Sequence, residues 1–101
     1  VGTSGWQTQL RSQEQSLRAQ LARSDGQRFP RGSGLELTYD IEQVDDLCRR
    51  IEDAFASGRP LQPDAVRLAV FKSRRGARGY REASVDAFLD RVVELLVVAA
   101  V

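Results

Sequence analysis

The sequence contains no histidine and no methionine, and it has a single cysteine among its 101 residues. Histidine is the commonest general base and metal ligand, so its absence argues against most hydrolytic and metal-dependent enzymes. One cysteine allows neither an internal disulfide nor the usual zinc site, and it makes a reducing, cytoplasmic setting the default. We therefore expect a protein that is not an enzyme and that uses no metal and no cofactor.

Long apolar runs and an excess of one charge are also missing. The longest apolar run covers residues 95–101, far fewer than the roughly 20 residues that span a bilayer. No charged leader followed by an apolar core stands at the N-terminus, so we expect no signal peptide. The formal net charge is +1, so any attraction to anionic lipid or nucleic acid must be local.

Helical periodicity is what the sequence does contain. Trp6, Leu10, Leu17 and Leu21 recur at the spacing of one helix face, and two later segments repeat apolar residues in steps of three and four. The second of these segments has an apolar face wider than a coiled-coil seam requires. The expected helices cover about residues 6–24, 40–56, 63–70 and 82–98. The fold class is thus expected to be all-α, a small bundle of about four helices.

Helix-capping and helix-breaking residues mark the predicted ends of the helices. Asp40, followed three residues later by Gln43, forms a capping-box pattern at the start of the second helix. Gly58 ends that helix, and Pro63 suits the first turn of the short third helix. The Gly-containing stretch 25–38 and the basic stretch 72–81 are predicted to be loops.

Two stretches of the chain resemble each other at a fixed offset. At 41 residues, the matched pairs are Tyr39 with Tyr80, Val44 with Val85, Asp45 with Asp86, Leu47 with Phe88 and Ile51 with Val92. Phe29 and Phe71 precede their tyrosines by ten and nine residues. Any two amphipathic helices share apolar spacing, but the aligned tyrosines, Val-Asp pairs and phenylalanines favour a true internal duplication.

The second copy carries a recognisable order of motifs. A Leu-Gln-Pro tripeptide from Leu61 leads a short helix, and Phe71, a basic loop, Arg-Gly-Tyr80 and Val85-Asp-Ala-Phe-Leu-Asp follow. Over about residues 61–96 this order resembles the N-terminal domain of bacterial DivIVA-family proteins. The resemblance divides the chain into an N-terminal amphipathic helix (1–27), a degenerate DivIVA-like repeat (28–56) and a second DivIVA-like repeat (61–101).

The resemblance implies a cytoplasmic scaffold or adaptor of cell division or envelope growth. Such proteins self-associate through paired parallel helices, act at the inner face of the cell membrane at the septum or pole, and can recruit Arg-containing tails of cell-wall synthesis proteins. We expect the two repeats to form, within one chain, the pair that relatives form between chains. A peripheral membrane-binding module and an oligomerisation module of a longer protein are the alternatives.

Three residues of the second copy match the partner-binding groove of these relatives, namely Tyr80, Asp86 and Asp90. Positions four apart share a helix face, so the two carboxylates can converge on one guanidinium. The alternative is a structural role, in which Asp86 holds the Arg-Gly-Tyr loop through backbone N–H groups or pairs internally with Arg78. In the first copy Arg49 stands at the third position and reverses its charge, so recruitment is expected at the second copy only.

The basic stretch is a candidate membrane contact. Its cations are Lys72, Arg74, Arg75 and Arg78. Each cation near an anionic leaflet adds about 1 kcal/mol of attraction. Relatives usually present a hydrophobic side chain at this tip, whereas Ser73, Gly76 and Ala77 stand here, so a solvated loop is the alternative. Nucleic acid is not an expected partner, because no aromatic residue lies between the arginines to stack on bases.

Overall fold

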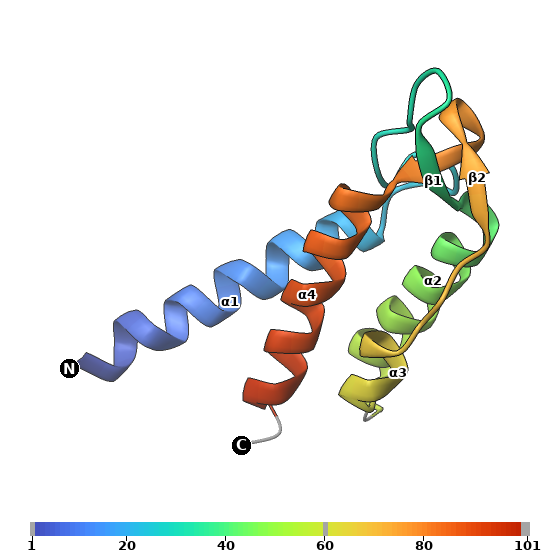
Figure 1. Ribbon diagram of the computed structural model, residues 1–101. Helices are drawn as coiled ribbons and strands as arrows, with labels where there is room; N and C mark the ends of the chain where they lie inside the picture. The colour runs from blue at the N-terminus through green and yellow to red at the C-terminus, as the bar shows by residue number, and fades with distance from the viewer. Residues whose placement is uncertain (1, 60, 100–101) are drawn as a thin grey trace.

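The computed structural model describes residues 2–59 and 61–99, with side chains described between residues 11 and 98. The helices of this part are α1 (Gly2–Leu21), α2 (Ile41–Ser57), α3 (Pro63–Arg67) and α4 (Glu82–Ala99). The strands are β1 (Leu37–Asp40), β2 (Ser73–Arg75) and β3 (Gly79–Arg81), and a short 3₁₀ turn, η1 (Gly76–Arg78), joins the last two. Figure 1 shows the strands gathered at one end of the molecule, away from both chain termini.

The expected all-α fold is wrong, because a three-stranded antiparallel sheet caps the helices. Its strand order is β2-β1-β3, with β1 in the middle. The stretches 25–38 and 72–81, predicted to be loops, supply most of these residues. Strands of three or four residues are too short to show a period-two pattern, and β2 is exposed throughout. Pairing between distant segments, rather than local propensity, therefore creates these strands.

The centre of the sheet is nearly symmetric about its two tyrosines. Tyr39 of β1 lies opposite Tyr80 of β3, and these residues are 41 positions apart. Two further main-chain hydrogen bonds, each at 2.9 Å, also correspond between the copies. Asp40 N–H donates to the Lys72 carbonyl, and Arg81 N–H, 41 residues later, donates to the Pro30 carbonyl. Each copy thus contributes the same kind of strand contact to the other.

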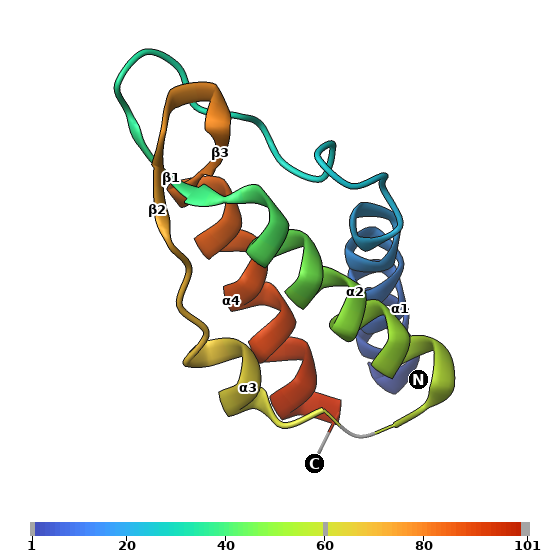
Figure 2. The ribbon, with the colours of Figure 1, turned by 90° about the vertical axis from the view of Figure 1, so that its right-hand side faces the viewer.

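Helices α2 and α4 begin directly after the two paired strands. Figure 2 shows both of them running from the sheet towards the opposite end of the molecule, so they are roughly parallel. The predicted cap of α2 is confirmed, since the Asp40 carboxylate accepts a hydrogen bond from Gln43 N–H at 3.0 Å. Gly58 ends α2 at a φ of 70°, a conformation that glycine adopts without a Cβ clash.

The apolar faces of the helices meet in one core. Val44 and Val85, the matched valines of the two copies, are both fully buried, and burying such a side chain contributes about 1.5–3 kcal/mol. The other buried apolar residues are Leu17, Leu21, Phe29, Leu47, Cys48, Ile51, Val66, Tyr80, Phe88, Leu89 and Val92. The heptad-like spacing of the two long helices therefore predicted their buried faces correctly.

The first and third helices differ in length from their predictions. Helix α1 begins at Gly2 and ends at Leu21, and α3 ends at Arg67 instead of about residue 70. The side chains of Trp6 and Leu10, which the periodicity assigned to the apolar face of the first helix, lie outside the described residues. None of the described helices combines the length and the apolarity that a membrane-spanning segment needs.

Candidate functional site

The two matched tyrosines exchange partners between the copies. The Tyr80 hydroxyl donates to Asp45 Oδ1 at 2.7 Å, and the Tyr39 hydroxyl donates to Asp86 Oδ1 at 2.8 Å. Each tyrosine thus contacts the aspartate of the other copy. The structure does not bring Tyr80 and Asp86 together, so the tyrosine of the groove at Asp86 is Tyr39.

The upstream phenylalanines follow the same exchange. Phe29 packs edge-on against Tyr80, and Phe71 packs at a tilt against Tyr39, each with ring centroids 5.2 Å apart. Such aromatic contacts contribute about 0.5–1.5 kcal/mol beyond the area that they bury. The molecule therefore holds two related sites, each with an aspartate, a tyrosine and a phenylalanine.

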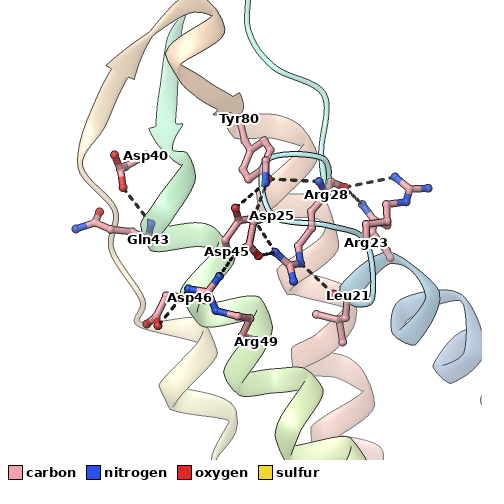
Figure 3. Close-up of polar contacts among 12 residues, drawn as sticks. Leu21, Arg23, Asp25, Arg28, Asp40, Gln43, Asp45, Asp46, Arg49 and Tyr80 are labelled. Atoms are coloured by element: carbon pink, nitrogen blue, oxygen red, sulfur yellow. Dashed lines mark hydrogen bonds and ion pairs between the residues drawn. The ribbon is translucent and has the colours of Figure 1, made fainter.

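The site at Asp45 is filled by an arginine of the chain itself. Arg28 and Asp45 are 4% and 2% exposed, and Arg28 Nη1 lies 3.1 Å from Asp45 Oδ1 (Figure 3). Arg28 Nε donates to the Leu21 carbonyl at 2.9 Å. Asp45 also accepts a hydrogen bond from Gly26 N–H at 2.8 Å. The guanidinium thus lies between the Asp45 carboxylate and the Leu21 carbonyl, while the main-chain N–H of Arg28 donates to the Tyr80 hydroxyl at 3.3 Å.

The pKa values of Arg28 and Tyr80 in this filled site keep the arginine charged and the tyrosine neutral. Burial alone would lower the pKa of Arg28, but hydrogen bonds to Asp25 and Asp45 outweigh it and hold that pKa above its ordinary value. Burial, followed by the hydrogen bond to Asp45, raises the pKa of Tyr80 to about 12. The arginine stays charged and the tyrosine stays neutral over the physiological range.

A second carboxylate reaches the guanidinium from the loop after α1. Asp25 Oδ1 lies 2.6 Å from Arg28 Nη1, and Asp25 Oδ2 lies 2.6 Å from Arg49 Nη1. Hydrogen bonding to Arg28 is the leading cause that lowers the pKa of Asp25, with a further contribution from Arg49. The filled site therefore surrounds one guanidinium with two carboxylates, of which Asp25 also pairs with Arg49.

The related site at Asp86 is open. It is a pocket of about 430 Å³ whose wall includes Tyr39, Phe71, Asp86 and Asp90. Asp90 matches Arg49 at the 41-residue offset, so this copy carries its second carboxylate on α4 itself. Both carboxylates are exposed. The pocket therefore offers two negative groups on one helix face beside an aromatic wall.

Among the residues that the structure describes, no arginine fills the open pocket in the way that Arg28 fills its counterpart. At the 42-residue offset set by the phenylalanines, Arg28 corresponds to Val70, which is 89% exposed. Arg67 lies in the pocket wall, but its guanidinium pairs with Asp64 at 2.9 Å. Within the described residues, neither Asp86 nor Asp90 has an ion pair, and Asp86 does not pair with Arg78.

The hydroxyl of Tyr39 is held at the edge of the open pocket. Burial, followed by the hydrogen bond to Asp86, raises the pKa of Tyr39 to about 12. The neutral hydroxyl donates a hydrogen bond to Asp86 and can still accept one from another donor. Tyr39 is thus positioned to fix the Asp86 carboxylate and to accept a hydrogen bond from a ligand.

The basic stretch does not form one free cluster. Arg74 Nε pairs with Asp40 Oδ1 at 2.8 Å, and Arg75 Nη1 donates to the Leu35 carbonyl at 2.9 Å. Lys72 and Arg78 have no ion pair among the residues described. Hydrogen bonding to Arg74 lowers the pKa of Asp40, so that contact is a charged one.

The structure also places an apolar residue at the sheet end of the molecule, where the sequence indicated none. Leu35 is 81% exposed, and its loop lies against η1, since Gly76 N–H donates to the Glu36 carbonyl at 2.9 Å. Gly76 has a φ of 58°, and an added Cβ would collide with the Gly34 carbonyl. The exposed apolar side chain that residues 73–77 lack is therefore present in the other copy, at the same end of the molecule.

The described part of the chain offers neither a metal site nor a reactive thiol. It contains no cluster of three or more potential metal-ligating side chains. Cys48 is fully buried, and burial raises the pKa of its thiol to about 12, so it behaves as a small core residue. No protein-family model, no curated protein and no solved structure matches the chain.

Sequence reasoning identified both carboxylates of the open pocket but missed its tyrosine and the internal arginine. The internal repeat points to both residues once the two copies are known to pair with two-fold symmetry. A two-fold pair of repeats exchanges contacts across its axis, so Tyr39 belongs with Asp86. The step from Arg28-Phe29 to Val70-Phe71 marks the position where the cation that fills the first site is replaced by an apolar residue.

Proposed function

We propose that this chain is a non-enzymatic adaptor that binds an arginine side chain of a protein partner in the open pocket. Asp86 and Asp90 would hold the guanidinium, and Tyr39 would supply the aromatic wall and a hydroxyl. One observation carries the proposal: the related site of the same molecule holds a guanidinium, Arg28, on the matched aspartate and beside the matched tyrosine.

The chemistry of the pocket favours arginine over lysine. Two carboxylates four residues apart on α4 present several acceptor oxygens, and a planar guanidinium with five donors can satisfy them from one position. An ammonium group has three donors and no flat face to lay against a ring. The proposed partner is therefore a protein segment with an accessible arginine, such as the Arg-containing tails that the DivIVA resemblance implies.

An NMR titration tests the arginine pocket directly. Uniformly ¹⁵N-labelled protein would be titrated with N-acetyl-arginine methylamide and, separately, with the lysine equivalent. We expect saturable amide shifts around Tyr39, Asp86 and Asp90 with the arginine probe only. Because hydrogen bonds to charged groups contribute about 1.5–3 kcal/mol, the Asp86→Asn/Asp90→Asn protein should bind the probe at least tenfold more weakly.

A matched control comes from the same helix. Glu94 is an exposed acid on α4 that does not line the open pocket, so Glu94→Gln should leave the titration unchanged. Equal shifts with the lysine probe would contradict the proposal. Equal affinity of the Asp86→Asn/Asp90→Asn protein and the Glu94→Gln protein would also contradict it.

The DivIVA resemblance supplies the proposed setting, which is cell division or envelope growth at the cytoplasmic face of the membrane. Both tyrosine–aspartate contacts form within one chain, so neither site needs a second chain for completion. Self-association beyond this internal pair stays a prediction, which size-exclusion chromatography with light scattering tests. A fluorescent fusion that spreads evenly through dividing cells would contradict the proposed setting.

A second candidate function is membrane-surface binding through the sheet end of the molecule. The exposure of Leu35 favours it, together with Arg75, which donates to the Leu35 carbonyl, and Arg78 of η1. An inserted leucine contributes about 1.5–3 kcal/mol and each nearby cation about 1 kcal/mol. This combination suits reversible binding to an anionic leaflet.

Liposome co-sedimentation separates the two candidates. Vesicles with phosphatidylglycerol should bind the protein, and Leu35→Ser should weaken this binding about tenfold or more. Val70→Ser is the matched control, because Val70 is equally exposed but lies away from the arginines of the sheet end. Equal loss with both variants, or no binding at all, would contradict membrane contact and leave the arginine pocket untouched.

A further inference from the structure

In the filled site, main-chain N–H groups as well as the Arg28 guanidinium contact Asp45 and Tyr80. Gly26 N–H donates to Asp45 Oδ2 at 2.8 Å, and Arg28 N–H donates to Tyr80 Oη at 3.3 Å. The Arg28 guanidinium lies 3.1 Å from the other carboxylate oxygen, Oδ1. The segment Gly26–Arg28 therefore occupies this site as a bound tripeptide would, with three donors directed at two side chains.

Glycine is required at the first position of this segment. Gly26 has a φ of 81°, and the left-handed region costs an ordinary L-residue about 1–2 kcal/mol. That turn directs the Gly26 N–H and the Arg28 side chain towards the same carboxylate. The pattern that the site accepts is thus a glycine two residues before the arginine.

The open pocket has the same acceptor groups, an aspartate and a tyrosine hydroxyl, but no segment that the structure describes donates hydrogen bonds to them as Gly26 and Arg28 do in the filled site. The Tyr39 hydroxyl donates to Asp86 as the Tyr80 hydroxyl donates to Asp45. The chain segment that corresponds to 26–28 is 68–70, but Leu68 N–H donates to the Asp64 carbonyl at 2.9 Å instead. No hydrogen bond joins 68–70 to Tyr39 or Asp86 in the described part of the chain.

We propose that the open pocket selects a partner segment of the form Gly-x-Arg, with the glycine at positive φ. The glycine N–H would donate to Asp86, the arginine N–H to Tyr39 Oη, and the guanidinium to Asp86 and Asp90. The inference rests on the proposed function, since it assumes that the pocket takes an arginine. An acidic residue directly before the glycine, as Asp25 is in the filled site, would be repelled by Asp90.

Peptide binding to the full chain tests the pattern, measured by fluorescence anisotropy. The reference probe is fluorescein-labelled Ala-Ser-Ala-Gly-Gln-Arg-Ala-amide. Replacing its glycine by L-alanine should weaken binding about fivefold to thirtyfold, because the turn becomes strained. D-Alanine favours positive φ and should bind within about twofold of glycine or more tightly. Sarcosine removes the N–H donor and should weaken binding about tenfold or more.

The outcomes separate this inference from the proposal on which it rests. If the glycine, L-alanine and D-alanine peptides bind equally, and all bind more weakly to the Asp86→Asn protein, the pattern is overturned and the arginine pocket stands. If a citrulline peptide binds as well as the arginine peptide, or if no peptide binds, both ideas are overturned. Glu94→Gln protein should bind every peptide as the unchanged protein does.

Discussion

Replacing Arg28 by alanine should be among the most destabilising single substitutions in this protein. The change removes a cation that is 4% exposed and leaves Asp45, which is 2% exposed, without its countercharge. It also removes the donor to the Leu21 carbonyl. A buried carboxylate without a cation is held in a low-dielectric environment that disfavours its charge.

The structure sets the expected size of this loss. Breaking a buried ion pair by removing one partner costs about 3–5 kcal/mol. The Tyr80 hydroxyl and the Gly26 N–H still donate to Asp45 in the variant, so we expect the lower end, about 3 kcal/mol. Single domains have a total stability of about 5–15 kcal/mol, so this loss is a large share.

Urea unfolding followed by circular dichroism at 222 nm measures this loss as a change in the free energy of unfolding. The double variant Arg28→Ala/Asp45→Asn should lose clearly less than the sum of its single variants, because the amide does not carry the stranded charge. Arg67→Ala is the control, since its ion pair with Asp64 is exposed and contributes about 1 kcal/mol or less. A loss at Arg28 no larger than at Arg67 would refute the reasoning.

Three further predictions concern residues that hold the two sites in place. Asp40→Ala should lower the free energy of unfolding by about 0.5–2 kcal/mol in urea titrations, because Gln43 N–H loses its cap; no loss would contradict the capping role. Gly76→Ala should lower the melting temperature by several degrees in calorimetry, because a Cβ there meets the Gly34 carbonyl and φ is positive; an unchanged value would contradict the close approach. Absorbance at 295 nm should show that both tyrosines, Tyr39 and Tyr80, ionise with a pKa of about 12 and neither near the ordinary value of 10. Since the pKa of Tyr80 is raised in the folded state, the stability that Tyr80 contributes is complete below pH 10 and is lost as the pH rises to about 12; an ionisation near pH 10 in the folded protein would contradict these raised pKa values.

The long helices and their buried faces could be predicted because their signal is local. Val44 and Val85 lie at helical spacing within amphipathic segments, and Asp40 with Gln43 is a short-range capping pattern. These features depend on residues three or four positions apart, which a sequence displays directly. The burial of Cys48 follows from the same spacing.

The sheet and the pairing of the sites could not be predicted in the same way. Strand β1 pairs with residues 73–75 and 79–81, and such distant pairing leaves no mark in a three-residue strand. The same pairing places Tyr39, not Tyr80, beside Asp86. Each copy taken alone suggests a tyrosine and an aspartate of the same copy, whereas a two-fold arrangement exchanges them.

The position of the exposed Leu35 also could not be predicted from the sequence. In the sequence it lies in a Gly-rich stretch of the first copy, far from the arginines of the second. Tertiary contacts bring the two loops together, among them the hydrogen bonds from Arg75 to the Leu35 carbonyl and from Gly76 to the Glu36 carbonyl. The exposed leucine and the arginine that contacts its main chain thus belong to different copies.

The most direct measurement of the central claim is an isotope-filtered NOE spectrum of the protein with ¹³C-labelled N-acetyl-arginine methylamide. We predict contacts from the arginine δ protons to the Tyr39 ring and to α4 protons near Asp86, with none to the buried Tyr80. Arginine contacts confined to other acidic surfaces, such as Glu94, or contacts that persist unchanged in the Asp86→Asn/Asp90→Asn protein, would contradict the account.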